Sequence, residues 1–130
     1  MANTDNLLSF VAHEAITEYA LVSVRVDGKI QITDSEDETN CVGIAQRACS
    51  AGDSVEVKVL GKSRAIAGGD ILPATMNLLM AATDGKLVAF DEGAGNYAVA
   101  RMLPNINQVS AASGDQINVI FTGPVALTAS

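Results

Sequence analysis

Tryptophan is absent from this 130-residue chain, and its aromatic residues are two tyrosines and three phenylalanines. Hydrophobic residues make up 48% of the sequence, but many of them are alanine and valine. A core built from such small side chains has few large anchors, so each buried residue contributes little apolar area. We therefore expect association with copies of itself to add to its stability. A monomer that is fully stable in dilute solution would count against this expectation.

Cysteine and histidine are also scarce. Cys41 and Cys49 are the two cysteines, and His13 is the single histidine. Two cysteines do not form a disulfide scaffold, and a metal site would need partners that one histidine hardly provides. We interpret both cysteines as structural thiols, which could pair only if the fold brings them together.

Positive charge is limited to eight lysines and arginines, against fifteen acidic residues, which gives a net charge of −7. Nucleic-acid binding requires a dense basic surface, and here the basic residues are spread through the chain, so we expect no nucleic-acid partner. No apolar run approaches the length of a membrane span. Residues 1–6 lack the charged start and hydrophobic run of a secretion signal. We expect a soluble protein made in the cytoplasm, without a membrane partner.

The sequence contains the same series of short turn motifs twice, in the same order. Asp27-Gly28-Lys29 corresponds to Asp84-Gly85-Lys86, and Ala51-Gly52-Asp53 corresponds to Ser113-Gly114-Asp115. The offset grows from 57 to 62 residues between these pairs, which indicates a short insertion around Pro104 to Ala112. Turns and strands repeat, whereas reactive side chains do not. The repeat therefore favours a structural protein over an enzyme.

The first of these motifs, Asp27-Gly28-Lys29, and its flanking residues predict a β-hairpin. The valines at positions 22, 24 and 26 alternate with polar residues, which predicts a strand with the valines on one face. Asp27-Gly28 is a pair favoured where a tight hairpin requires positive φ. The alternation resumes at Ile30 and Ile32 on the return strand. Residues 41–45, 55–59, 87–90, 97–101 and 117–122 are predicted as further strands.

The segment from Asp70 to Ala82 fits two structures. Met76, Leu79 and Met80 have helical spacing, and Asp70 could cap a helix. The apolar residues that directly precede Asp84-Gly85, however, hold the position of the first hairpin strand. The repeat therefore favours a strand at Leu78–Ala82.

Short strands about ten residues apart, separated by turns, predict an all-β fold, either a small barrel or a sandwich. We expect one domain over residues 1–130, built from two related β-hairpin-rich halves at 20–63 and 77–125. Residues 1–14 are assigned to an N-terminal arm outside both halves. Their apolar residues fall near helical spacing, so a short helix or an extra strand are alternatives: Leu7, Leu8, Phe10 and Val11.

Three segments resemble nucleotide-binding or metal-binding motifs, and each lacks a required feature. Leu60-Gly61-Lys62-Ser63 matches the end of a phosphate-binding loop, but Glu56 stands where that loop needs glycine. Gly93-Ala94-Gly95 is followed by a β-like segment, not by the helix of a dinucleotide site. The acidic run of residues 34–38 lacks the alternation and central glycine of a helix-loop-helix calcium site. We expect no cofactor and no metal.

Catalytic pairs are equally incomplete. His13 and Glu14 could form half of an acid–base pair, but no motif places a nucleophile near them. Asp91 and Glu92 are adjacent, so in a strand or turn their side chains point apart, unlike a glycosidase pair. We expect the protein not to be an enzyme.

The whole pattern resembles the β-rich branch of the small head decoration, or capsid cement, proteins of tailed bacteriophages. The likeness covers about residues 15–123. It rests on an ordered series: the Asp-Gly-Lys hairpin, the Val-Gly-Ile-Ala strand at 42–45, the Ala-Gly-Asp turn, and a valine strand ending at Gly61. The second half echoes the series at 78–88, 98–100 and 114–123. The chain departs from the shorter family pattern at Met1–Glu14 and at Pro104–Ala112.

This resemblance implies a β module on the outer capsid surface of a virion, synthesised in the host cytoplasm. Its implied partners are the major capsid protein, whose contacts it would stabilise, and itself, as a homotrimer in preference to a homodimer. Terminal arms often supply lattice contacts in this family, so Leu7, Leu8, Phe10 and Val11 are the candidate contact residues. The alternatives are another phage structural β module (tail, fibre or baseplate), a glycan-binding β domain, and a small enzyme.

Overall fold

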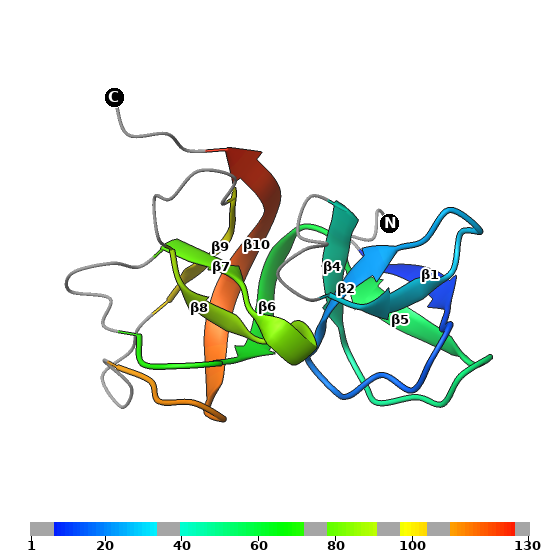
Figure 1. Ribbon diagram of the computed structural model, residues 1–130, viewed down its shortest axis with the longest axis horizontal. Coiled ribbons are helices and arrows are strands. Elements are labelled where there is room, and N and C mark those ends of the chain that lie inside the picture. The colour runs from blue at the N-terminus through cyan, green and yellow to red at the C-terminus, as the bar shows by residue number, and fades with distance from the viewer. Residues whose placement is uncertain (1–6, 34–39, 72–77, 91–96, 104–109, 127–130) are drawn as a thin grey trace, which may run out of the picture.

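The computed structural model describes residues 7–33, 40–71, 78–90, 97–103 and 110–126. They form two five-stranded antiparallel sheets that lie side by side (Figure 1). The first sheet has the order β1-β5-β4-β2-β3. Its strands are β1 (Leu7–Val11), β2 (Leu21–Val24), β3 (Ile30–Ile32), β4 (Cys41–Ala45) and β5 (Ser54–Lys58).

The second sheet has the order β6-β10-β9-β7-β8, which is the first order with five added to every strand number. A 3-10 turn at Thr83–Gly85 joins β7 to β8. The strands are β6 (Gly61–Ile66), β7 (Leu78–Ala81), β8 (Leu87–Ala89), β9 (Tyr97–Met102) and β10 (Gln116–Ala126). The prediction of an all-β fold from two related halves is confirmed.

Each sheet is strongly curled, so that its two edges approach each other. After β1, Ala12 forms a parallel bridge to Ile30 of β3, and after β6, Ala67 forms the same bridge to Leu87 of β8. One bridge does not make a continuous ladder between the edge strands. The fold is therefore a small β sandwich and not a closed barrel.

The repeated turns have matching hydrogen bonds. Gly52 N donates to Ala12 O at 2.8 Å, and Gly114 N donates to Ala67 O at 2.8 Å. The two turn carboxylates accept equivalent hydrogen bonds. Asp53 Oδ2 accepts one from Ser50 N, and Asp115 Oδ2 accepts one from Ala112 N. The Ala-Gly-Asp and Ser-Gly-Asp segments are thus equivalent in three dimensions.

The hairpin prediction at Asp27-Gly28 is confirmed, with one error in detail. Gly28 has a φ of +86° in the turn between β2 and β3. Val26 does not share the buried face of Val22, because β2 ends at Val24 and Val26 is fully exposed in the turn. Ser23, expected on the polar face, is buried and forms a 2.6 Å hydrogen bond to Thr33 Oγ1. Both faces of β2 are therefore covered.

Residues 7–11 form strand β1, so the arm and the short helix are both wrong at these positions and the extra strand is correct. β1 pairs with β5, with Phe10 opposite Val55. The equivalent strand β6 begins at Gly61, inside the stretch assigned to the first half, yet it pairs with β10 of the second sheet. Each half thus begins with a strand that the sequence repeat did not include. Residues 1–6 lie outside the described part of the chain.

The strand prediction at Leu78–Ala82 is confirmed by β7, which pairs with β8 and β9. Local spacing suited a helix, but Leu79 and Ala81 are both buried, as period-two alternation requires. The long-range pairing decides the structure here.

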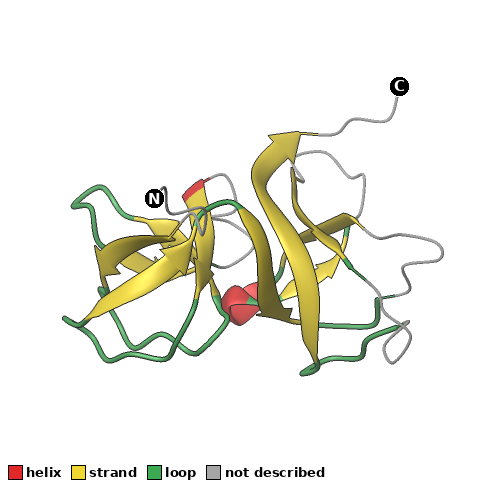
Figure 2. Cartoon of the chain, turned by 180° about the vertical axis from the view of Figure 1, so that it is seen from behind, coloured by secondary structure: helices red, strands yellow, loops and turns green. Residues whose placement is uncertain are grey.

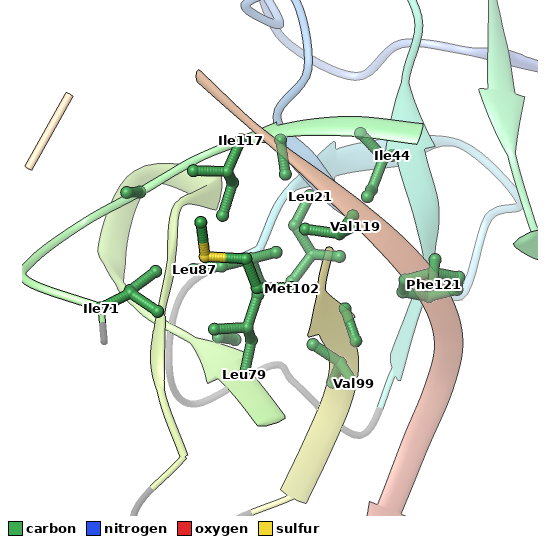
Figure 3. Packing of buried hydrophobic residues seen from close by; sticks show 14 of the residues in the cluster. Leu21, Ile44, Ile71, Leu79, Leu87, Val99, Met102, Ile117, Val119 and Phe121 are labelled. Atoms are coloured by element: carbon green, nitrogen blue, oxygen red, sulfur yellow. The ribbon is translucent and has the colours of Figure 1, made fainter. Parts of the chain in front are cut away.

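Two hydrophobic clusters show how the sheets pack. One cluster fills the inside of the first sheet and contains Val22 and Ala45. The other fills the inside of the second sheet and also contains Leu21 and Ile44 (Figure 3). Since successive residues of a strand point to opposite faces, Leu21 and Ile44 lie on the outer face of the first sheet. This outer face packs against the inner face of the second sheet. We call this arrangement head-to-tail packing.

A difference in side-chain size accompanies this packing. Phe10 pairs with Val55 and packs against the first cluster, so it helps to fill its own sheet. The equivalent residue of the second sheet is Ala65, which pairs with Ile117. The smaller Ala65 belongs to the same buried cluster as Leu21 and Ile44 of the first sheet. The 3-10 turn lies at the contact between the two sheets, which we call the seam (Figure 2). There, Gly85 N donates to Thr33 O at 2.8 Å.

Candidate interaction surfaces

The four candidate contact residues lie together on β1, an edge strand of the first sheet. Leu8 is 54% exposed and Val11 is 39% exposed. Phe10, in contrast, packs against the buried cluster, and Leu7 is half-buried. Leu8 and Val11 are therefore the residues available to a partner. The strand carries no charged residue, and charge is one of the features that protect an edge strand against pairing with another strand.

The opposite edge of the same sheet is protected. Glu14 Oε2 accepts a hydrogen bond from Ile32 N on β3 at 2.9 Å. The backbone of His13 is tied to the same strand, since His13 N donates to Ile30 O at 2.8 Å. The His13-Glu14 pair thus has a structural role at the edge of β3.

The outer face of the second sheet carries a row of alternating apolar and basic residues. Ile120 of β10 pairs with Lys62 on one side and with Arg101 on the other, and Arg101 pairs with Leu78. Residues directly opposite in a sheet share a face. Lys62 and Arg101 are exposed, and Ile120 is 36% exposed. Sequence reasoning missed this row because its members come from four separate strands.

A shallow pocket of about 340 Å³ is lined by Asp70, Ser110, Ala111, Ala112 and Asp115. The Asp115 carboxylate already accepts the turn hydrogen bond from Ala112 N at 3.0 Å. No group of three metal-ligating side chains occurs among the described residues. The same residues include no helix long and apolar enough to cross a membrane.

The remaining motifs have structural explanations or lie outside the described residues. Gly61-Lys62-Ser63 opens strand β6, which continues to Ile66. Ser63 accepts a 3.0 Å hydrogen bond from Gln46 Nε2. Cys41 and Cys49 are not joined by a disulfide. The acidic run at 34–38 and the segment 91–96 lie outside the described ranges.

No known protein family matches the sequence, and no curated protein sequence matches it. A solved structure, the head fiber gp8.5 N base in bacteriophage phi29, superimposes with a TM-score of 0.67. The alignment covers 92% of this chain and 96% of the fiber base, at 18% sequence identity. The two chains share one fold. At this identity the likeness concerns backbone topology, since most side chains differ.

One exposed ion pair ties β5 to the loop that precedes it. Arg47 Nε donates to Glu56 Oε1 at 3.0 Å, and Arg47 also donates to the Ser54 carbonyl. The hydrogen bond from Arg47 lowers the pKa of Glu56 below its ordinary value of 4.5. A carboxyl group with a lowered folded-state pKa stabilises the fold at neutral pH. That contribution is lost as the pH falls through the folded-state pKa.

Glu56→Gln is therefore expected to lower the melting temperature slightly at pH 7. The difference from the unchanged protein should shrink as the pH falls below 4.5, because Glu56 takes up its proton there. Thermal melts above and below this pH measure it. In an Arg47→Gln background the same substitution should lose its pH dependence, whereas a constant difference in both backgrounds would contradict the pairing.

Proposed function

We propose that this chain is a non-enzymatic structural protein of a phage head. It binds the outer capsid surface and stabilises contacts between major capsid subunits. The observation that carries the proposal is the fold shared, over nearly the full length of both chains, with the base of a phage head fiber. The order of turn and strand motifs, which resembles capsid decoration proteins, supports the same role independently.

The edge of β1 suits a role in binding a shell. An edge strand offers unpaired backbone groups to an extended segment of a partner, while alternate side chains provide specificity. On β1, Leu8 and Val11 are exposed apolar side chains on opposite faces of the strand, so a partner strand paired along this edge could contact one on each face. A modest contact of this kind becomes strong when many linked copies on one particle act together. We therefore assign the capsid contact to β1, with Leu8 and Val11 as its main residues.

Self-association belongs to the same proposal. A homotrimer fits positions on local three-fold axes of an icosahedral shell, and we favour it over a homodimer. The mass of the purified protein in solution, measured by light scattering, distinguishes a trimer from a dimer or a monomer.

A second candidate function is the base of a head fibre, favoured by the description of the structural neighbour. Both functions place the chain on the outside of the head. Electron cryo-microscopy of the virion separates them, because a cement protein forms compact density over subunit seams and a fibre base continues into a projecting fibre.

Co-sedimentation with heads that lack the protein tests the capsid contact. The unchanged chain is expected to bind heads and not isolated tails. The double variant Leu8→Asp and Val11→Asp should weaken binding by at least about tenfold, since it places charges in an apolar contact. Deletion of residues 1–12 is unsuitable, because it would remove β1 from the first sheet.

Val26→Asp with Leu60→Asp is the matched control, because it adds the same two charges at exposed apolar residues outside β1. It should bind as the unchanged chain does. Circular dichroism melts establish that each variant is folded. Binding to tails alone would overturn the head assignment, and unchanged binding by the folded β1 variant would overturn the contact at β1.

A further inference from the structure

The basic row on the second sheet has a counterpart on the first sheet. There, Leu21 pairs with Ile44, Ile44 with Lys58, and Lys58 with Leu7. The equivalent residues of the second sheet, in the same order, are Leu78, Arg101, Ile120 and Lys62. The two rows occupy the same place in two sheets of the same topology.

The two rows differ in what covers them. In the first sheet, Leu21 is 1% exposed and Ile44 is 0% exposed, because both enter the core of the second sheet. In the second sheet, Leu78 is half-buried and Arg101 is exposed. The surface that makes the inter-sheet contact in one half is thus uncovered in the other.

Arg101 of the second sheet stands where the first sheet has Ile44. This difference changes the kind of partner that the outer face of the second sheet can bind. Burying an unpaired guanidinium in an apolar core costs several kcal/mol. A third curled sheet could therefore not pack on Arg101 as the second sheet packs on Ile44. A partner must instead supply negative charge.

The charge distribution supports this requirement. Arg64 lies on the same face, since it pairs with Asn118, two residues before Ile120. The five strands of the second sheet contain no aspartate or glutamate. Within the described ranges, the ion pairs are Arg25–Asp27 and Arg47–Glu56. Lys62, Arg64 and Arg101 therefore have no acidic partner among the described residues, in a chain whose net charge is −7. Arg64 donates a 3.2 Å hydrogen bond to the neutral Gln116 Oε1.

We infer that the outer face of the second sheet is a docking surface for an acidic protein segment. Lys62 and Arg101 are its charged anchors, and Ile120 is its apolar centre. Strand spacing places the Cα atoms of Lys62 and Arg101 roughly 10 Å apart, on either side of Ile120. Charged groups around a small apolar centre are the usual anatomy of a specific protein contact. This surface lies on a different sheet from β1.

Nucleic acid is the less suitable partner. Its affinity depends on many phosphate contacts, and this face offers three cations on a protein that is otherwise strongly acidic. An acidic polypeptide can meet the same cations with a few carboxylates and cover Ile120 with an apolar side chain. The test below includes a DNA duplex as the competing ligand.

The experiment uses the full ¹⁵N-labelled chain, titrated at low ionic strength with poly-L-glutamate. Amide chemical-shift changes are expected on β6, β9 and β10, centred on Ile120, and added salt should reverse them. The double variant Lys62→Glu and Arg101→Glu should weaken the apparent affinity by at least about tenfold, because it reverses both anchoring charges.

The matched control is Lys29→Glu with Lys86→Glu, which makes the same change in net charge at the two equivalent hairpin turns. It should bind within about twofold of the unchanged chain. An absence of shifts, shifts centred on another surface, or equal weakening by the control would overturn the proposal. Tighter binding of a short DNA duplex to the same face would assign it to nucleic acid instead. The probe contains no capsid protein, so this result is independent of the head-binding assay.

Discussion

Replacing Ile44 by alanine is expected to lower the free energy of unfolding by about 2–5 kcal/mol, the range for a buried isoleucine. Ile44 belongs to the first sheet but is 0% exposed in the cluster of the second (Figure 3). The substitution leaves a cavity at the seam, where the two sheets hold each other in place. Urea denaturation of the purified chain measures the loss.

Arg101→Ala is the control for Ile44→Ala, because Arg101 occupies the equivalent position of the second sheet and is exposed. Its effect should stay within about 0.5 kcal/mol. Equal effects of the two substitutions would mean that the sheets do not pack head to tail. A transition in two separate steps for Ile44→Ala would show that the two sheets no longer unfold together.

Gly43→Ala is expected to destabilise the protein by about 3 kcal/mol, through overpacking against backbone. A Cβ at Gly43 would lie 2.2 Å from the Lys58 carbonyl oxygen and 2.6 Å from Val57 Cγ1. The Lys58 backbone cannot move freely, because Lys58 pairs with both Ile44 and Leu7. Thermal melting should show a decrease of roughly 10 °C.

Gly69→Ala provides the comparison for Gly43→Ala. A Cβ at Gly69 would meet Val88 Cγ1 at 3.5 Å, an ordinary contact. Its effect should stay within about 1 kcal/mol, since alanine also restricts the unfolded chain. If Gly43→Ala melts at the temperature of Gly69→Ala, then β4 and β5 do not approach each other as closely as described.

The two halves have the same strand topology, but side chains at equivalent positions differ in size, charge and burial. Phe10 packs against the core of the first sheet, whereas the smaller Ala65 shares the core of the second sheet with Leu21 and Ile44. Ile44 is buried in the contact between the two sheets. Arg101, at the equivalent position of the second sheet, is exposed and charged, so a third sheet cannot pack there in the same way. Size and charge at equivalent positions thus determine that the chain forms one pair of sheets with a free basic face.

The candidate contact surfaces were predictable only in part. The apolar residues at 7–11 stand out in the sequence as a possible contact segment, but their strand structure depends on pairing with β5, about fifty residues away. The basic row gave one weak local signal, the alternation of Lys62 and Arg64 with Ser63 and Ala65. Arg101 and Ile120 join that row through strand pairing alone.

The sequence by itself determined the all-β class, the hairpin at Asp27-Gly28 and the duplication. These features depend on local physics: period-two burial along a strand, and turn residues that tolerate the required φ values. Only the tertiary structure decided which face of each sheet is covered. Leu21 and Leu78, or Ile44 and Arg101, occupy equivalent strand positions, and their burial differs because the second sheet packs on one member of each pair and nothing in the described chain packs on the other.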